Sequence, residues 1–209
     1  YYDQQWKKVE ANSQKGIYKN NLPIILEIQN QATKDNNTIQ LIKSLKAEFS
    51  ILSLTHADTQ NDETTRFFSK LKPIGEKLKG NDKLLYKVLL TEFFSEYYED
   101  NSWEINQRTS LFLNGKSLLS GEGFREGLGE RLEDWAKADF KNYLKIAYSE
   151  LEKEKSALKQ VNLEPYKEIF SKEANYQYFS NLFDWNTKNQ IDFLQNSDLF
   201  TPNERKENN

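Results

Sequence analysis

The stretch that decides the fold is LGERLEDWAKADFKNYLKIAYSELEKEKSALKQ, residues 128–160, which contains no proline. Apolar residues recur in it at intervals of three and four positions, the spacing that lines one face of an α-helix. They are Leu132, Trp135, Ala136, Phe140, Tyr143, Leu144, Ala147, Leu151 and Leu158. A single helix of this length would measure about 50 Å, so other helices must pack along it. The sequence therefore predicts an all-α fold around one long helix.

Shorter helical segments precede this stretch and follow one another closely. Apolar periodicity predicts helices over residues 2–16, 20–34, 37–56, 64–78 and 84–98. Gly16 and the Asp35-Asn36-Asn37 turn separate the first three, and Pro73 predicts a kink or an early end of the fourth. Such short connections favour antiparallel helical hairpins, although no fixed repeat of ~34 residues is found. We expect residues 1–100 to form a helical-hairpin region.

Residues 101–127 break the helical pattern. Gly115, Gly121, Gly123 and Gly127 alternate there with apolar residues that have no helical period. A connection of this length is uncommon in a compact domain, so we expect a long loop that is functional or mobile. A short helix through Phe170 and a last helix over residues 176–196 are expected to complete the same domain within residues 128–200. Residues 201–209 are expected to form a frayed tail.

The composition indicates a folded chain and excludes several functions. Of the 209 residues, 37% are hydrophobic and 13% aromatic, and disordered segments rarely carry so many rings. The 29 basic and 32 acidic residues are interspersed, so we expect no nucleic-acid partner. The absence of cysteine removes disulfides, thiol nucleophiles and thiolate metal sites. No run approaches the roughly 20 apolar residues of a membrane span, so none is expected in this chain.

Residue types suited to catalysis are present, but not in catalytic sets. His56 is the only histidine, so no imidazole pair can bind a metal or share a proton. Gly115-Lys116-Ser117 has the form of the end of a phosphate loop, but Ser110 stands where that loop requires glycine. Glu133 and Asp134 are paired acids at a helix start, where capping explains them. We therefore expect no catalytic residue, no cofactor and no metal.

Aromatic residues beside the long loop are the main candidates for a binding surface. Tyr97, Tyr98 and Trp103 could stack on sugars or pack against apolar side chains of a partner. Rings at helical spacing more often belong to a core. Both alternatives stay open at this point.

Several short segments together carry a family resemblance. They are Tyr98-x-x-Asn101-x-Trp103-x-Ile105-x-x-Arg108-Thr109, Asp134-Trp135, Leu163-x-x-Tyr166, and Leu182-Phe183-Asp184-Trp185 followed by Ile191-Asp192-Phe193. With Trp6-Lys7-Lys8-Val9 at the start, they resemble the N-terminal helical region of large bacterial alpha-2-macroglobulin-like proteins of the cell envelope. The segments extend over nearly the whole chain. The residues Asn186-Thr187-Lys188-Asn189-Gln190 depart from the small and basic residues usual in that family.

The resemblance implies a cellular context. Such proteins are exported, often as lipoproteins, and continue into β-sandwich domains, so the implied location is periplasmic or in the cell envelope. The chain also lacks methionine, and we expect it to be a processed piece of a longer product. Macroglobulins that trap proteases use a thioester formed from Cys and Gln in a distant domain. This chain has no Cys, so that reaction is not within it.

The resemblance also implies structural roles for particular residues. Arg108 is expected to pin the long loop by pairing with a carboxylate. Trp103, Asp184 and Trp185 are expected to lock helix ends, and Trp135 belongs to the opening of the long helix.

Three functions follow from these observations. The first is a non-catalytic α-helical scaffold or protein-interaction module, forming the N-terminal part of a larger exported macroglobulin-like protein. It would bind a protein partner or neighbouring domains of the same polypeptide, through a groove between hairpins or through residues 101–127. Its surface would include Tyr97, Tyr98, Trp103 and Arg108. The second is a glycan or small-ligand binding module that uses the rings near the loop. The third is an enzyme, which would need acids that converge in a cleft.

Overall fold

The structure, a computed structural model, describes residues 1–55, 62–109, 132–170 and 176–207. Within these residues every regular element is a helix, so the predicted all-α class is confirmed. A single antiparallel bridge, between Asn162 and Asn181, is the extended pairing found in this part of the chain. The chain divides into two compact units. Unit 1 is Tyr1–Phe67 with Glu164–Ala174, and unit 2 is Phe68–Leu163 with Asn175–Asn209.

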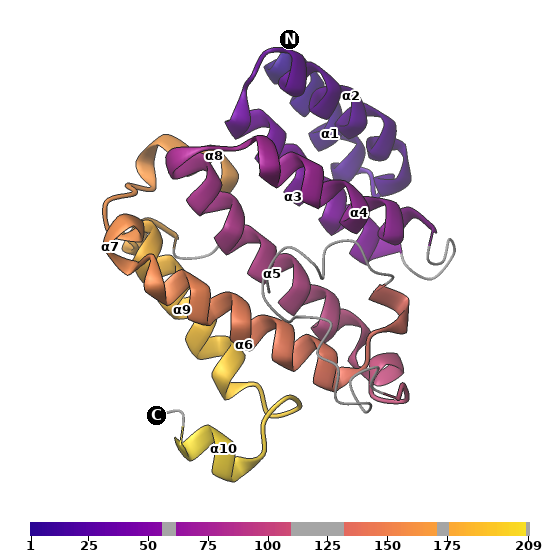
Figure 1. The fold of residues 1–209 in the computed structure, drawn as a ribbon. Helices are drawn as coiled ribbons and strands as arrows, with labels where there is room; N and C mark the ends of the chain where they lie inside the picture. Colours follow the sequence, from indigo (N-terminus) through magenta and orange to yellow (C-terminus); the bar gives the residue numbers. More distant parts are fainter. Residues whose placement is uncertain (56–61, 110–131, 171–175, 208–209) are drawn as a thin grey trace. The chain divides into compact units, whose positions relative to one another are not determined.

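Unit 1 begins with three helices that follow one another closely (Figure 1). They are α1 (Tyr2–Gln14), α2 (Asn21–Lys34), which follows the 3₁₀ turn η1 (Tyr18–Asn20), and α3 (Thr38–Thr55). Helix α2 packs against both α1 and α3. Gly16 ends α1 with a φ of +72°, a left-handed conformation that favours glycine. Asn37 caps α3 because its Oδ1 accepts a hydrogen bond from the Gln40 amide at 3.1 Å. The predicted helices are confirmed here.

A short segment from late in the chain completes unit 1. It consists of the 3₁₀ turn η5 (Glu164–Tyr166) and helix α8 (Lys167–Phe170). Helix α8 packs against α3, with Ile169 and Phe170 buried. The Lys46 ammonium of α3 lies 5.4 Å from the centre of the Phe170 ring. The chain thus divides after Phe67 and returns to unit 1 at Glu164, rather than dividing at the predicted limits of residues 100 and 128. Periodicity along the chain carries no signal for such a return.

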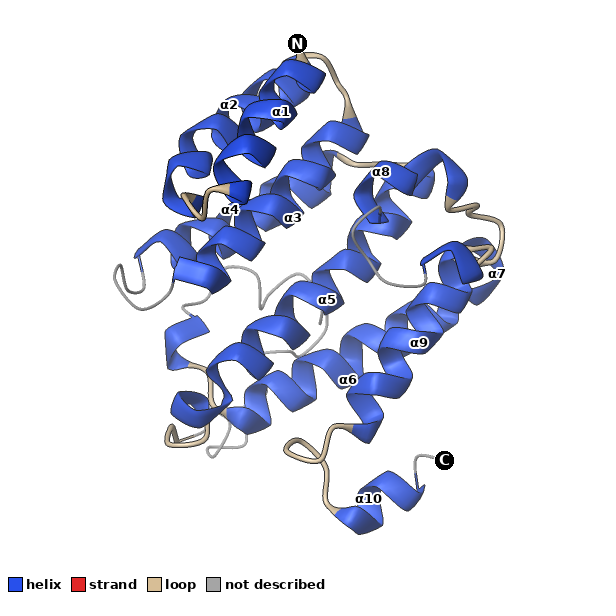
Figure 2. Ribbon diagram, turned by 180° about the vertical axis from the view of Figure 1, so that it is seen from behind, coloured by secondary structure: helices blue, strands red, loops and turns tan. Residues whose placement is uncertain are grey.

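Unit 2 takes the later part of α4 (Asp62–Lys77) and most of the remaining helices. These are α5 (Gly80–Ile105), α6 (Lys137–Lys153), α7 (Lys155–Leu158), α9 (Leu182–Gln195) and α10 (Pro202–Glu207), with the 3₁₀ turns η4 (Leu132–Asp134) and η6 (Tyr176–Tyr178). Helices α5 and α6 lie side by side in both views (Figures 1 and 2). Helix α9 contacts α5 and α7. The core of unit 2 therefore lies between α5 and the helices of the second half of the chain.

The expected single helix over residues 128–160 is interrupted, and the longest described helix is α5, with 26 residues. Ala136 is extended, at φ −92° and ψ 172°, and its amide donates to the Asp139 carboxylate at 2.8 Å. That hydrogen bond caps α6, so the helix starts at Lys137 instead of continuing from η4. Glu154 separates α6 from α7 and binds Lys87 of α5. The apolar spacing continues across residues 136 and 154, so it does not reveal that the helix is interrupted at these two positions.

Large rings fill the core of unit 2. The Phe94 ring of α5 has its centre 4.3 Å from that of Tyr143, 5.0 Å from Phe68 and 5.6 Å from Trp135. Helix α5 is apolar nearly all round, which predicts a central position, and it packs on α6 and α9. Pro73 lies inside α4, which continues to Lys77, so of the two alternatives predicted at Pro73, a kink or an early end, the early end is wrong.

The expected frayed tail also differs, since residues 202–207 form α10. Thr201 and Glu204 bind each other reciprocally at its start: the Thr201 amide donates to Glu204 at 2.9 Å, and the Glu204 amide donates to the Thr201 hydroxyl at 3.4 Å. Lys141 of α6 donates to Glu204 at 2.7 Å. The hydrogen bond from Lys141 and those from Thr201 lower the pKa of Glu204 to about 2.

Of the helices in the described part of the chain, none has the length and apolar character needed to cross a membrane.

Candidate functional site

A groove of about 250 Å³ opens between α1 and α3 of unit 1. Its apolar lining comes from four helices, namely Trp6 and Val9 of α1, Ile25 of α2, Ile51 and Leu54 of α3, and Ile169 of α8. Leu54 is 66% exposed, so its side chain adds to the apolar surface that the groove leaves open. Val9, Ile25 and Ile51 are buried and form a core cluster with Trp6 packed against it. The groove is therefore an open apolar surface on a packed floor.

The helical period explains how these side chains come together. Trp6, Val9 and Ser13 recur on α1 at intervals of three and four, so they share one face. On α3, Lys43, Ala47, Ser50 and Leu54 follow the same rule. The stripe from Lys43 to Leu54 extends about 16 Å at 1.5 Å per residue. The α1 stripe from Trp6 to Ser13 covers about two helical turns and the α3 stripe about three.

A polar network fixes the end of the groove near α8. The Trp6 indole donates to Gln40 Oε1 at 2.7 Å, and Gln40 Nε2 donates to Glu168 Oε2 at 3.0 Å. Lys43 donates to the same Glu168 oxygen at 3.2 Å, and its ammonium lies 4.7 Å from the centre of the Trp6 ring. Helices α1, α3 and α8 are thus tied together around one tryptophan. The ring is held in place before any partner arrives.

Asn21 of α2 holds α1, which forms one wall of the groove. Its Nδ2 donates to the Val9 carbonyl at 3.1 Å and to the Ser13 hydroxyl at 3.0 Å. The Ser13 hydroxyl donates in turn to the Val9 carbonyl at 2.9 Å. Asn21 is buried, so these bonds are shielded from water. Both ends of the α1 wall are therefore anchored by side-chain hydrogen bonds.

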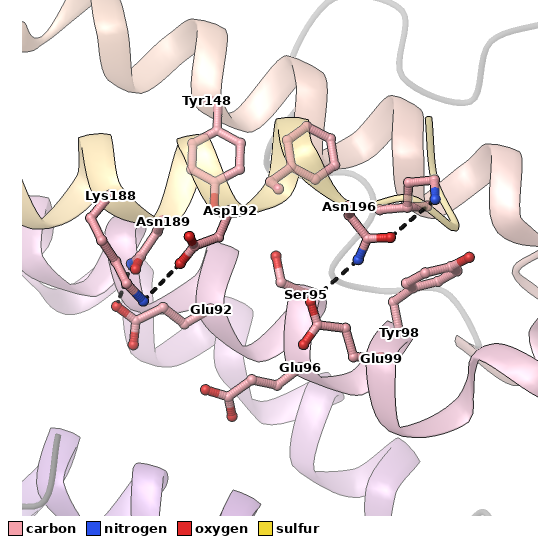
Figure 3. A pocket seen from close by; sticks show the side chains of 12 residues that line it. Glu92, Ser95, Glu96, Tyr98, Glu99, Tyr148, Lys188, Asn189, Asp192 and Asn196 are labelled. Atoms are coloured by element: carbon pink, nitrogen blue, oxygen red, sulfur yellow. Dashed lines mark hydrogen bonds and ion pairs between the residues drawn. The ribbon is translucent and has the colours of Figure 1, made fainter. Parts of the chain in front are cut away.

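Unit 2 has a smaller, polar pocket of about 180 Å³ between α5 and α9 (Figure 3). Its carboxylates are Glu92, Glu96, Glu99 and Asp192. Glu92 accepts from the Trp185 indole and from Asn189 Nδ2, the latter at 2.7 Å, while Glu99 accepts from Asn196 at 3.3 Å. Lys188 pairs with Asp192 at 2.8 Å. These bonds join α5 to α9 or stabilise α9 itself, so we assign the pocket a structural role.

Burial affects one carboxylate of this pocket. Partial burial raises the pKa of Glu99, and the charges of Asp100 and Asp192 act in the same direction. The hydrogen bond from Asn196 and the charge of Lys188 oppose the rise. A raised carboxyl pKa is one property of a general acid.

Within the described residues, no group of three or more potential ligands is arranged to bind a metal ion.

The rings proposed as a ligand surface do not lie together on the surface. Tyr97 is 7% exposed and Tyr98 is 1% exposed, whereas Trp103 is 77% exposed. The rings of both tyrosines pack near Phe140, with centres 5.8 and 5.7 Å away, and the Tyr98 hydroxyl donates to Asp198. The assignment of Tyr97 and Tyr98 to a partner or ligand surface is therefore corrected, because α5 turns both into the core.

Arg108 was expected to pair with a carboxylate, but its shortest contacts are to backbone carbonyls. Its guanidinium donates to the carbonyls of Leu132 and Trp135 at 3.2 and 3.1 Å. Glu104, one turn earlier on α5, lies 3.9 Å from it. Arg108 thus joins the end of α5 to the start of η4, on either side of residues 110–131. The expected loop begins later than residue 101, since α5 continues to Ile105.

Of the residues expected to be structural, Trp103 is corrected, because its side chain is 77% exposed and does not lock a helix end by packing. The others lie at packed or capping positions. Trp135 is buried among Phe94, Phe140 and Tyr143. Asn181 caps α9, because its Oδ1 accepts from the Asp184 amide at 3.0 Å, and the Asp184 carboxylate supports this cap by accepting from Asn181 Nδ2 at 2.8 Å. Trp185 is buried and binds Glu92 of α5.

Other sequence candidates lie outside the described residues. His56, Gly115-Lys116-Ser117 and the remaining glycines of residues 110–127 are among them. The groove was not predicted residue by residue: Trp6 was selected only as part of the motif at the start of the chain, and Leu54 only fell within an expected helix. One signal was present: Ile51, Leu52 and Leu54 cover more of the α3 circumference than one buried face requires.

Comparisons of this chain with family models, with curated proteins and with solved structures found no match. Its function must therefore be argued from the two units themselves. What they offer is an open apolar groove in unit 1 and a polar pocket in unit 2 whose groups hold helices together.

Proposed function

We propose that this chain is a non-catalytic α-helical module that binds another protein or a neighbouring domain of the same polypeptide. The observation that carries the proposal is the groove between α1 and α3, where apolar side chains line an open surface. Burial of such a surface by a partner is the main source of affinity in protein association. The anchored Trp6 ring is of the residue type enriched at the centres of interfaces, and Leu54 adds exposed apolar area beside it.

The polar pocket of unit 2 gives weaker support to an enzyme. Glu92 accepts two hydrogen bonds from α9, and Asp192 is paired with Lys188. The first of these contacts joins α9 to α5 and the second stabilises α9 itself, so both are structural. Glu99, with its raised pKa, would need a second group poised for proton transfer. We therefore propose that unit 1, and not the polar pocket of unit 2, carries the binding function.

The alternative of a glycan or small-ligand module loses two of its three rings, because Tyr97 and Tyr98 are buried. Of these three rings only Trp103 is exposed, and sugar stacking sites gain affinity from polar groups placed around the ring. We make no separate proposal for this function. A sugar that binds this chain should perturb Trp103 and leave Trp6 unchanged.

The family resemblance supports a more specific proposal. On it we propose that the chain forms the N-terminal part of a larger exported macroglobulin-like protein, a lipoprotein of the periplasm or cell envelope. The motifs around Trp103, Arg108, Trp135 and Asp184 are the basis for this proposal. Fractionation of the source cells, with an antibody against this chain, should find it in the envelope fraction. Recovery only in the cytosolic fraction contradicts the proposed location.

The binding function can be tested with a photo-crosslinking amino acid at Leu54, in the protein as its source cells make it. Ile191 of α9, 54% exposed and outside the groove, is the matched control position. We expect a discrete adduct from position 54, either with another protein or with another domain of the same polypeptide, and none from position 191. Position 54 giving no discrete adduct, or the same adducts as position 191, contradicts the function.

A further inference from the structure

We infer that the groove of unit 1 binds an acidic amphipathic helix of its partner, an inference that rests on the proposed function. The shape of the groove is the first reason. Its walls are stripes of two helices, and the α3 stripe runs for about three helical turns. A helix laid along the groove would place apolar side chains at intervals of three and four residues against Val9, Ile51 and Leu54. An extended peptide would turn every second side chain away from the groove.

Rigidity of the walls is the second reason. The Trp6 indole is held by Gln40, and the Val9 turn of α1 is held by Asn21. A preformed apolar groove costs less conformational entropy on binding than one that must be assembled. It also requires a partner of matching regular shape, which an amphipathic helix supplies.

Charge decides the chemistry of the partner. The charged residues that line the groove are two lysines, Lys43 and Lys46, and one carboxylate, Glu168. An ammonium group has three donors, so Lys43 can bind a partner carboxylate while it keeps Glu168. Because α1 contributes only Trp6, Val9 and Ser13, no acidic side chain on that wall opposes an incoming carboxylate. A partner helix with Glu or Asp beside its apolar face is therefore favoured over one with Lys or Arg.

The test uses a synthetic amphipathic peptide as the probe, with Leu at helical spacing and Glu at the flanking positions. A second peptide has Lys in place of every Glu, and a third is a scrambled form of the first. Binding of each labelled peptide to the full chain is followed by fluorescence anisotropy at low ionic strength. We expect the acidic peptide to bind about tenfold more tightly than the basic one, since exposed ion pairs each contribute a few-fold. The scrambled peptide should bind much more weakly than either.

Variants locate the binding. Ser50→Trp fills the middle of the groove and should abolish binding of the acidic peptide. Gln4→Trp places the same ring at an exposed position of α1 outside the groove and should leave binding unchanged. Lys46→Glu should weaken the acidic peptide about three- to tenfold and strengthen the basic one. Circular dichroism of each variant checks that the helices are retained.

The possible failures are distinguishable. If both charged peptides bind equally and Ser50→Trp abolishes both, the charge assignment is overturned while the binding function stands. If the chain dimerises in light scattering and Ser50→Trp makes it monomeric, the occupant is a second copy and the acidic helix is overturned. If no peptide binds and the crosslinker at Leu54 also finds no partner, both the inference and the proposed function are overturned.

Discussion

Asn186 offers a sharp test of the packing between α9 and the rest of unit 2. Its side chain is 0% exposed, and neither Nδ2 nor Oδ1 has a hydrogen-bond partner in the part of the chain that the structure describes. A buried polar group without a partner costs about 1–3 kcal/mol relative to a solvated one. Leu has the same branching and the same number of side-chain heavy atoms. Asn186→Leu should therefore raise the free energy of unfolding by about 1–3 kcal/mol, less a repacking cost of up to about 1 kcal/mol, which leaves a net gain of about 1–2 kcal/mol over most of that range.

The assay is urea unfolding followed by tryptophan fluorescence, with the adjacent Trp185 as a reporter. We expect the midpoint to move to higher urea by about 0.5–1 M with an unchanged slope. Asn189→Leu, one turn later on α9, is the matched control. Asn189 donates to Glu92 at 2.7 Å, so its replacement should lower the free energy of unfolding by about 1–3 kcal/mol. If Asn186→Leu also destabilises the protein, the Asn186 amide is hydrogen-bonded in solution and the reasoning fails.

Three further changes test other contacts. Gly75→Ala should destabilise by about 1–3 kcal/mol in thermal unfolding, because the new Cβ would lie 2.7 Å from the Tyr86 ring; a stabilised variant would show that the ring can move. Glu204 has a lowered pKa, so its contribution to holding α10 is complete above pH ~4.5 and is lost as pH falls toward 2. Hydrogen exchange should show α10 amides losing protection over that interval, and protection that persists at pH 2 would contradict the role of the Lys141 contact. Glu99 has a raised pKa, so Glu99→Gln should stabilise at pH 7 and the gain should disappear as pH falls below ~4.5; a gain that is independent of pH would contradict the effect of burial.

The helices of unit 1 could be predicted from the sequence because each is bounded by local signals. Gly16 ends α1 in a left-handed conformation and Asn37 caps α3, and both signals are contained in a few adjacent residues. The interruption of residues 128–160 has a local cause as well, the Asp139 hydrogen bond to Ala136. Periodicity could not reveal it, because the apolar spacing continues on both sides of the cap.

The candidate site could not be predicted because it depends on contacts between residues that are far apart in the sequence. The groove requires α8 to return to α3, and Glu168 to meet Gln40 more than a hundred positions earlier. The choice between core and surface for Tyr97, Tyr98 and Trp103 depended on the rotation of α5, which its nearly uniform apolar character does not define. A helix with one clear apolar face would have allowed that choice. Arg108 donates to the carbonyls of Leu132 and Trp135, and backbone partners of this kind carry no sequence signal.

The most direct measurement of the central claim uses the four tryptophans, which lie in different surroundings. Trp6 lines the groove, Trp103 is exposed, and Trp135 and Trp185 are buried in unit 2. Their indole N–H signals in a ¹⁵N-labelled chain should be recorded while the acidic helical peptide is added. The account predicts that the Trp6 signal shifts and saturates while the other three stay in place. A shift of Trp103 alone, or no shift of Trp6 at saturating peptide, would contradict it.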